Sequence, residues 1–105
     1  MKAWELIADE SRWTKDAWAR DNRGAFTTPT DPLACRWCAL GALVRVYPES
    51  RTRTSIAMLY HRTYGSDIVQ DNDRGDMTAE KMSARLRVAE DGCQSTLKQQ
   101  KGETT

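Results

Sequence analysis

No apolar run in this chain of 105 residues approaches the roughly 20 residues that a membrane-spanning helix requires. A secretion signal is also missing, because the first ten residues, MKAWELIADE, contain acidic residues where such a signal carries an uninterrupted apolar stretch. We therefore expect an intracellular, cytoplasmic protein with no membrane contact.

Neither sign of charge dominates, since 16 basic and 15 acidic residues leave a net charge of +1. Dedicated nucleic-acid binders are usually clearly basic, so direct nucleic-acid binding is not expected. Charge is nevertheless uneven along the chain. A basic group comprises Arg45, Arg51, Arg53 and Arg62, and an acidic group comprises Asp67, Asp71, Asp73 and Asp76. These groups either form two solvated surfaces or a bipolar surface that steers a charged partner.

A useful stretch of alternating apolar and polar residues is absent as well, and this argues against β-sheet. Apolar residues instead recur at spacings of three and four. We predict an all-α fold, a compact bundle of four or five short helices in a single domain over residues 1–92. Residues 93–105 have little to bury, and we predict a flexible C-terminal tail there.

Residues 31–46, DPLACRWCALGALVRV, are the densest apolar segment of the chain. Asp31 and Pro32 are typical of a helix start, because the Asp side chain can cap free amides and Pro needs no donor there. The apolar positions cover most of the girth of such a helix, which predicts that it is buried and central. Gly41 indicates close approach by another backbone.

Shorter elements flank this helix. We predict helices over residues 3–10 and 11–18, either separate or as one kinked helix. A later helix ends at Gly65, which suits a left-handed cap. An Asp-rich loop then covers residues 66–77, and a last helix runs from Thr78 to about residue 90.

Residues 36–43, RWCALGAL, resemble a signature of a family of small uncharacterised proteins, common in actinobacteria and their phages. The resemblance spans about residues 3–90 and includes Trp13, Thr14, Ala17, Ala19, Arg20, Asp21, Asn72, Asp73 and Thr78. It implies an all-α fold and a phage or mobile-element origin, and it implies no activity. The chain departs from the family pattern at Cys35, where an apolar residue is common, and at Asp71, where an aromatic is common.

The closest cysteine pair, Cys35 and Cys38, raises the question of a metal or redox site. Three cysteines do not suggest a disulfide framework in a cytosolic chain. A zinc site would need Cys93 and His61 as further ligands, and neither has a partner at the usual spacing. A redox pair would begin a helix that follows a strand. We interpret the pair as core thiols and expect no cofactor, with zinc as the alternative.

An enzymatic alternative uses Cys38 as nucleophile and His61 as base, with Asn72 or Asp73 orienting the imidazole. Apolar neighbours would make this thiol unreactive. A calcium site in the acidic loop is rejected, because Gly75 stands one position early and the closing Glu is missing. We expect Asn72 or Asp73 to cap a helix or to pin the loop instead.

Four tryptophans are many for this length, and Trp13 and Trp18 cannot both face inward on one short helix. Because Trp and Arg are enriched at binding hot spots, we assign Trp18, the basic group and the acidic group as candidate contacts. We predict a small non-enzymatic binding or regulatory protein that docks on a host macromolecular complex. The specific hypothesis is an anti-CRISPR-like anti-defence inhibitor whose protein partner is a host defence nuclease complex.

Overall fold

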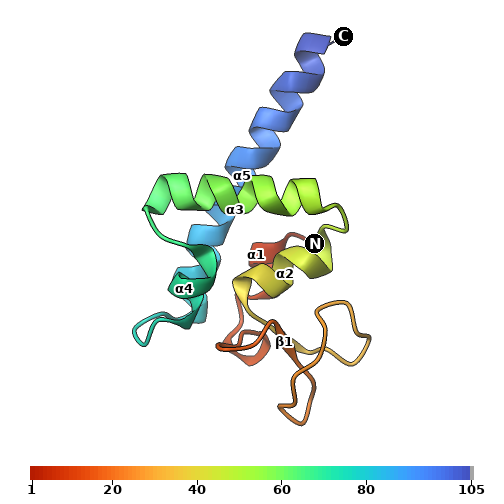
Figure 1. Cartoon of the computed structure of the whole chain (residues 1–105), viewed down its shortest axis with the longest axis vertical. Helices are drawn as coiled ribbons and strands as arrows, with labels where there is room; N and C mark the ends of the chain where they lie inside the picture. Colours follow the sequence, from red (N-terminus) through yellow and green to blue (C-terminus); the bar gives the residue numbers. More distant parts are fainter. Residues whose placement is uncertain (105) are drawn as a thin grey trace.

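The computed structural model describes the backbone of residues 1–104 and the side chains of residues 1–93. Within that part the fold is helical, as predicted, with one very small sheet (Figure 1). The elements in chain order are α1 (Ala3–Leu6), η1 (Glu10–Arg12, a 3₁₀ helix), β1 (Ala19–Arg20), β2 (Arg36–Trp37), α2 (Ala39–Val46), α3 (Ser50–Tyr64), α4 (Ile68–Asp73) and α5 (Ala79–Thr104). No helix of the described chain is both long and apolar enough to span a bilayer.

The core forms where α3 crosses α5, the most extensive contact between two elements (Figure 1). The fully buried side chains there include Ile56, Tyr60, Met82 and Leu86. α2 contacts α1, α3, α4 and α5, and buries Leu43 among them. In Figure 1, α1, α2 and α4 lie on one side of α3 with the first part of α5, whereas the end of α5 extends on the other side.

The helix predicted over residues 31–46 is only half formed. α2 begins at Ala39, with Cys38 as its N-cap, so the predicted start at Asp31 and Pro32 is wrong. Asp31 does cap a backbone amide, but in a turn, where its carboxylate accepts from the Leu33 N–H at 2.9 Å. As a result Leu33, predicted to be buried, is 68% exposed.

Pairing between distant segments explains why the helix starts late. β1 and β2 are antiparallel, with Ala19 opposite Trp37 and Arg20 opposite Arg36. The backbone just before α2 is therefore committed to the sheet and to the carbonyl of Trp18, which accepts from the Cys38 N–H at 3.3 Å. These contacts join residues far apart in sequence, so local helix signals could not show them.

Gly41 confirms the predicted close approach of two backbones. A Cβ atom at this position would lie 1.9 Å from the carbonyl oxygen of Trp18, well inside any allowed contact. The neighbouring backbone belongs to the segment before β1 rather than to a helix. Gly41 therefore lets α2 sit directly on the segment that carries Trp18.

The N-terminal helices are shorter than predicted. α1 ends at Leu6, and residues 13–18 are not helical. Asp16 has a positive φ of 59°, which a helix does not allow. The backbone of Thr14 instead donates to the carbonyl of Trp37 at 3.1 Å, so this segment follows β2.

The second half of the chain is closer to expectation. Gly65 ends α3 with a left-handed φ of 72°, and Thr78 caps α5 by accepting from the Lys81 N–H at 3.2 Å. The predicted loop over residues 66–77 is wrong in part, because α4 lies within it. Asp67 caps this short helix by accepting from the amides of Val69 and Gln70.

The last helix does not end near residue 90 as predicted, because α5 continues through Gly92 to Thr104. Gly92 allows α5 to pack closely against α3, since a Cβ at this position would lie 2.9 Å from Cδ2 of Leu59. Cys93, one residue later, is still buried. The rest of the predicted flexible tail, residues 94–105, lies outside the residues whose side chains the structure describes.

Candidate functional site

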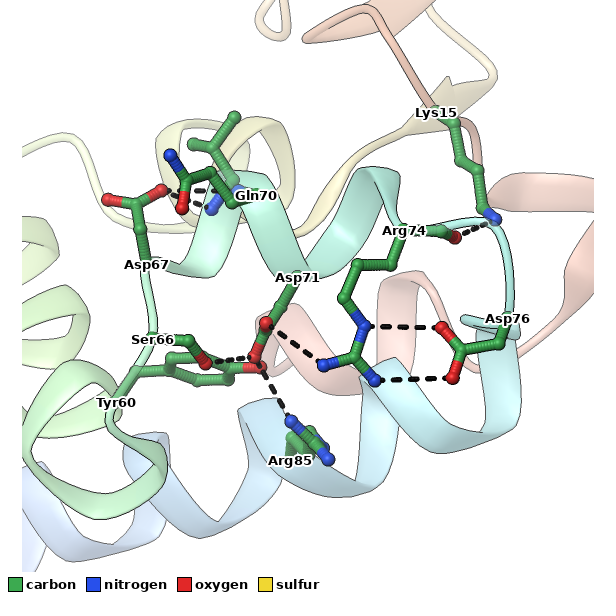
Figure 2. A network of polar contacts seen from close by, with 10 residues as sticks. Lys15, Tyr60, Ser66, Asp67, Gln70, Asp71, Arg74, Asp76 and Arg85 are labelled. Atoms are coloured by element: carbon green, nitrogen blue, oxygen red, sulfur yellow. Dashed lines mark hydrogen bonds and ion pairs between the residues drawn. The ribbon is translucent and has the colours of Figure 1, made fainter.

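The acidic group surrounds one buried carboxylate. Asp71 is 2% exposed, and its Oδ2 accepts from the hydroxyls of Tyr60 and Ser66, both at 2.7 Å, and from Arg85 at 3.0 Å (Figure 2). Its Oδ1 faces the guanidinium of Arg74 at 3.5 Å. The network thereby joins α3, α4 and α5.

The surroundings of Asp71 favour its charged form. Burial alone would raise the pKa of this carboxyl, but the hydrogen bonds from Tyr60 and Ser66 and the charges of Arg85 and Arg74 hold the pKa below its ordinary value. Burial and the neighbouring carboxylate raise the pKa of Tyr60, which stays protonated and keeps donating. Asp71, a predicted binding residue, is thus directed into the fold.

The other acidic candidates also have partners inside the chain. Asp67 caps α4. Asp73 accepts from the amide of Asp16 at 2.9 Å, and Asp76 pairs with Arg74 at 3.2 Å. That hydrogen bond and the charge of Arg74 lower the pKa of Asp76. Each member of the acidic group therefore has a partner in its own chain, and two of the four, Asp71 and Asp76, are paired with arginines.

Asn72 confirms the prediction that it caps a helix. Its side chain is fully buried, and its Oδ1 accepts from the Ala39 N–H at 3.0 Å, in the first turn of α2. The same oxygen accepts from the indole of Trp13 at 2.7 Å, and Nδ2 donates to the Thr14 carbonyl at 3.0 Å. These bonds fasten the segment before β1 to α2 and α4.

The residues of the enzymatic alternative are not joined in a catalytic arrangement. Cys38 is buried, and its burial raises the pKa of the thiol, which accepts from the Gly41 N–H at 3.2 Å. His61 lies on the exposed side of α3, and no hydrogen bond joins it to Cys38 in the described part of the chain. The side-chain oxygen of Asn72, the residue proposed to orient the imidazole, already accepts hydrogen bonds from the Trp13 indole and from the first turn of α2.

The proposed ligands of the metal alternative are not grouped either, within the side chains that the structure describes. Cys35, Cys38 and Cys93 are all free thiols, with Cys35 half-buried and the other two buried. Among the described side chains, no three His, Cys, Asp or Glu residues are grouped so that they could hold a metal ion.

A groove of about 820 Å³ lies between α2 and α3 and is here called the α2–α3 groove. One stripe of α3 forms one wall, α2 forms the other, and Trp18 and Asp67 complete it. The lining residues are Trp18, Leu40, Val44, Ser50, Arg53, Thr54, Ala57, Met58, His61, Arg62 and Asp67.

Helical periodicity explains why these side chains share a groove. After Ser50, the α3 residues come in adjacent pairs that recur every four positions, at 53–54, 57–58 and 61–62, and so lie on one face. Its opposite face buries Ile56 and Tyr60 in the core. α3 is therefore fastened to α5 on one side and left open on the other.

The groove is shallow and its apolar side chains are accessible. Trp18 is 54% exposed and Met58 is 59% exposed, and no lining residue is buried. The Trp18 backbone is nevertheless held, because its carbonyl lies against Gly41 and accepts from Cys38. An indole on a fixed backbone is thus presented at the groove.

Two members of the basic group line the groove. Arg53 donates to the carbonyls of Tyr47 and Pro48 at 2.7 and 2.8 Å, which fixes its guanidinium. Arg62 is exposed and has no carboxylate partner within residues 1–93. Arg45 lies elsewhere, with its guanidinium 5.8 Å from the ring of Trp37, and Arg51 is exposed but does not line the groove.

Sequence reasoning named Trp18, Arg53, Arg62 and Asp67 and missed the apolar part of the groove. Leu40 and Val44 were predicted to belong to the buried central helix, and Met58 was assigned no role. The available signal was the continuous α3 stripe of small, polar and apolar residues opposite Ile56 and Tyr60.

Comparison with models of protein families, with curated proteins and with solved structures gives no match to this chain. Its function is therefore inferred from its own contacts, burial and charge.

Proposed function

We propose that this chain is a small non-enzymatic binding protein that docks on a larger protein partner through the α2–α3 groove. The observation that carries the proposal is the exposure of Trp18 and Met58 beside Arg53 and Arg62 in one groove. Trp and Arg dominate binding hot spots, and Met adapts its shape to varied partners.

The physical driving force is the apolar area that Trp18 and Met58 leave in water. Covering such area stabilises a complex by roughly 25 cal/mol per Å². Because the Trp18 backbone is already fixed, less conformational entropy is lost on binding, and this favours affinity. Small-molecule sites usually enclose most of their ligand, whereas this groove has no buried lining residue, which favours a protein partner.

The target class that we favour is a host defence nuclease complex in the cytoplasm, blocked in the manner of an anti-CRISPR protein. Such inhibition needs only that a surface be occupied, which suits a single small domain. The resemblance of residues 36–43 to a family found in actinobacteria and their phages supports this target, because a phage protein would act against a host defence.

A plasmid-interference assay tests the proposal. The chain is expressed in strains that carry an active CRISPR effector and receive a targeted plasmid. We expect the wild type to restore transformation and the double variant Trp18→Ala, Met58→Ala to lose that effect.

The matched control is Phe26→Ala, Val88→Ala, which removes two apolar side chains that are 73% and 52% exposed but lie outside the groove. The control should restore transformation as the wild type does. Equal restoration by the folded groove variant would reject the groove as the docking surface, and no restoration by the wild type would reject the nuclease target.

A further inference from the structure

We propose that the occupant of the α2–α3 groove is an acidic amphipathic helix of about three turns, supplied by the partner protein. This inference rests on the proposed docking function and names the chemistry of the segment that docks. Three properties of the groove carry it, namely its length, its apolar floor and its charge.

The length of the groove matches a short helix. The lining stripe of α3 runs from Ser50 to Arg62, which at 1.5 Å per residue is roughly 18 Å. α2 lies beside α3 and runs roughly antiparallel to it (Figure 1). Helix-in-groove binding uses apolar anchors at positions i, i+3 or i+4, and i+7, which span roughly 10 Å of helix axis and so fit within this length.

The floor of the groove offers apolar contacts for such anchors. Leu40 and Val44 come from successive turns of α2, and Ala57 and Met58 come from the middle of α3. The indole of Trp18, more than half exposed, adds an aromatic surface to the lining. An anchor side chain can contact both helices at once and cover the exposed thioether of Met58.

The charge of the walls selects an acidic partner. Arg53, Arg62 and His61 line the groove, and α2 and α3, which form its walls, contain no Asp or Glu. The net charge of the whole chain is only +1, so this basic character is local. Among the lining residues the one carboxylate, Asp67, already accepts hydrogen bonds as the cap of α4. Carboxylates beside the apolar anchors of the partner helix would meet Arg62 and Arg53 at the rim and speed association.

A nucleic acid fits the groove less well. Only Arg53 and Arg62 bring guanidinium groups to it, and its floor is apolar. Nucleic-acid binding rests on several phosphate contacts, which two arginines do not supply. Because bases of single strands stack on exposed aromatic side chains such as Trp18, the test includes an oligonucleotide.

The test displays a library of random 14-residue helix-forming peptides and selects those that bind the full chain. We expect the selected peptides to be acidic and amphipathic and to gain helix on binding. Their binding should fall at least tenfold with Trp18→Ala, Met58→Ala and stay within twofold with Phe26→Ala, Val88→Ala.

Charge is tested with two exposed arginines of the same helix. Arg62→Glu should weaken the selected peptides at least tenfold, whereas Arg51→Glu, outside the groove, should change binding less than threefold. Overturning results would be an absence of binders, basic or non-helical binders, equal effects of the two variants, or tighter binding of a 15-nucleotide dT strand at Trp18.

The two proposals can fail separately. If groove variants abolish inhibition but the selection yields no acidic helix, docking stands and the helical occupant is wrong. If acidic helices bind the groove but the groove variants inhibit as the wild type does, the proposed function is wrong.

Discussion

The acidic network around Asp71 and the α2–α3 groove are both rich in charge, yet the chain uses them differently. Asp71 is 2% exposed and has four partners from its own chain, whereas Arg62 is exposed and has no carboxylate partner within residues 1–93. In the acidic network, charge holds helices together. In the groove, charge and apolar surface are left for another molecule. Burial and the presence of internal partners, rather than the density of charge, separate the two.

The largest expected effect comes from removing the centre of the network. Asp71→Ala leaves the Tyr60 hydroxyl and the partly buried Arg85 without their acceptor, so we expect a loss of about 4 kcal/mol in unfolding free energy. Urea denaturation measures it. Asp76→Ala, which removes a carboxylate that is 72% exposed, is the control and should leave the midpoint nearly unchanged. Similar losses in both variants would contradict a special role for Asp71.

Gly41 connects the groove to the fold, and its substitution should have the next largest effect. Gly41→Ala places a Cβ against the carbonyl of Trp18, so we expect a loss of about 3 kcal/mol and a displaced indole. Gly75→Ala is the control, because nothing lies within 4 Å of its Cβ. Thermal denaturation of both variants checks the difference, and equal melting temperatures would show that the two backbones can separate at little cost.

Acid should act on the network more than on the groove. Because the pKa of folded Asp71 is below its ordinary value, the unfolded state binds more protons in the acid range. The stabilisation is complete above the ordinary carboxyl pKa and is lost as pH falls through the pKa of the folded state. We expect stability to decline below about pH 5. Denaturant titrations from pH 7 to pH 3 should show a shallower decline in Asp71→Ala, and an unchanged decline would exclude Asp71 as its source.

The smallest effect is expected at Cys38. Ser is a good N-cap, so Cys38→Ser should change stability by less than about 1 kcal/mol and leave inhibition intact. Because burial raises the pKa of this thiol, iodoacetamide should label it slowly at neutral pH. A variant that folds but loses all activity would instead support the nucleophile alternative.

Local signals were sufficient for parts of the fold. The helical class, the left-handed cap at Gly65, the cap at Thr78 and the close approach at Gly41 follow from spacing and from the chemistry of single residues. The late start of α2 does not, because Asp31 caps a turn as readily as a helix. What decides between them is the pairing of residues 19–20 with residues 36–37, which no local pattern reveals.

In the candidate site, too, some residues could be predicted from local signals and others depend on long-range packing. Trp18, Arg53 and Arg62 were found because Trp and Arg are typical of interfaces. Asp71 was misjudged as a contact, since sequence does not reveal that Tyr60 and Arg85 converge on it. Met58 was missed, because the packing of α3 on α5 decides which of its faces stays open.

The most direct test of the comparison is a map of amide and indole NMR shifts in the full chain as a selected acidic peptide is added. We expect the indole of Trp18 and the amides along Ser50, Thr54, Met58 and Arg62 to shift most, with little change around Asp71 and Asp76. Shifts centred on the acidic network, with the Trp18 indole unmoved, would contradict the assignment of the groove as the docking surface.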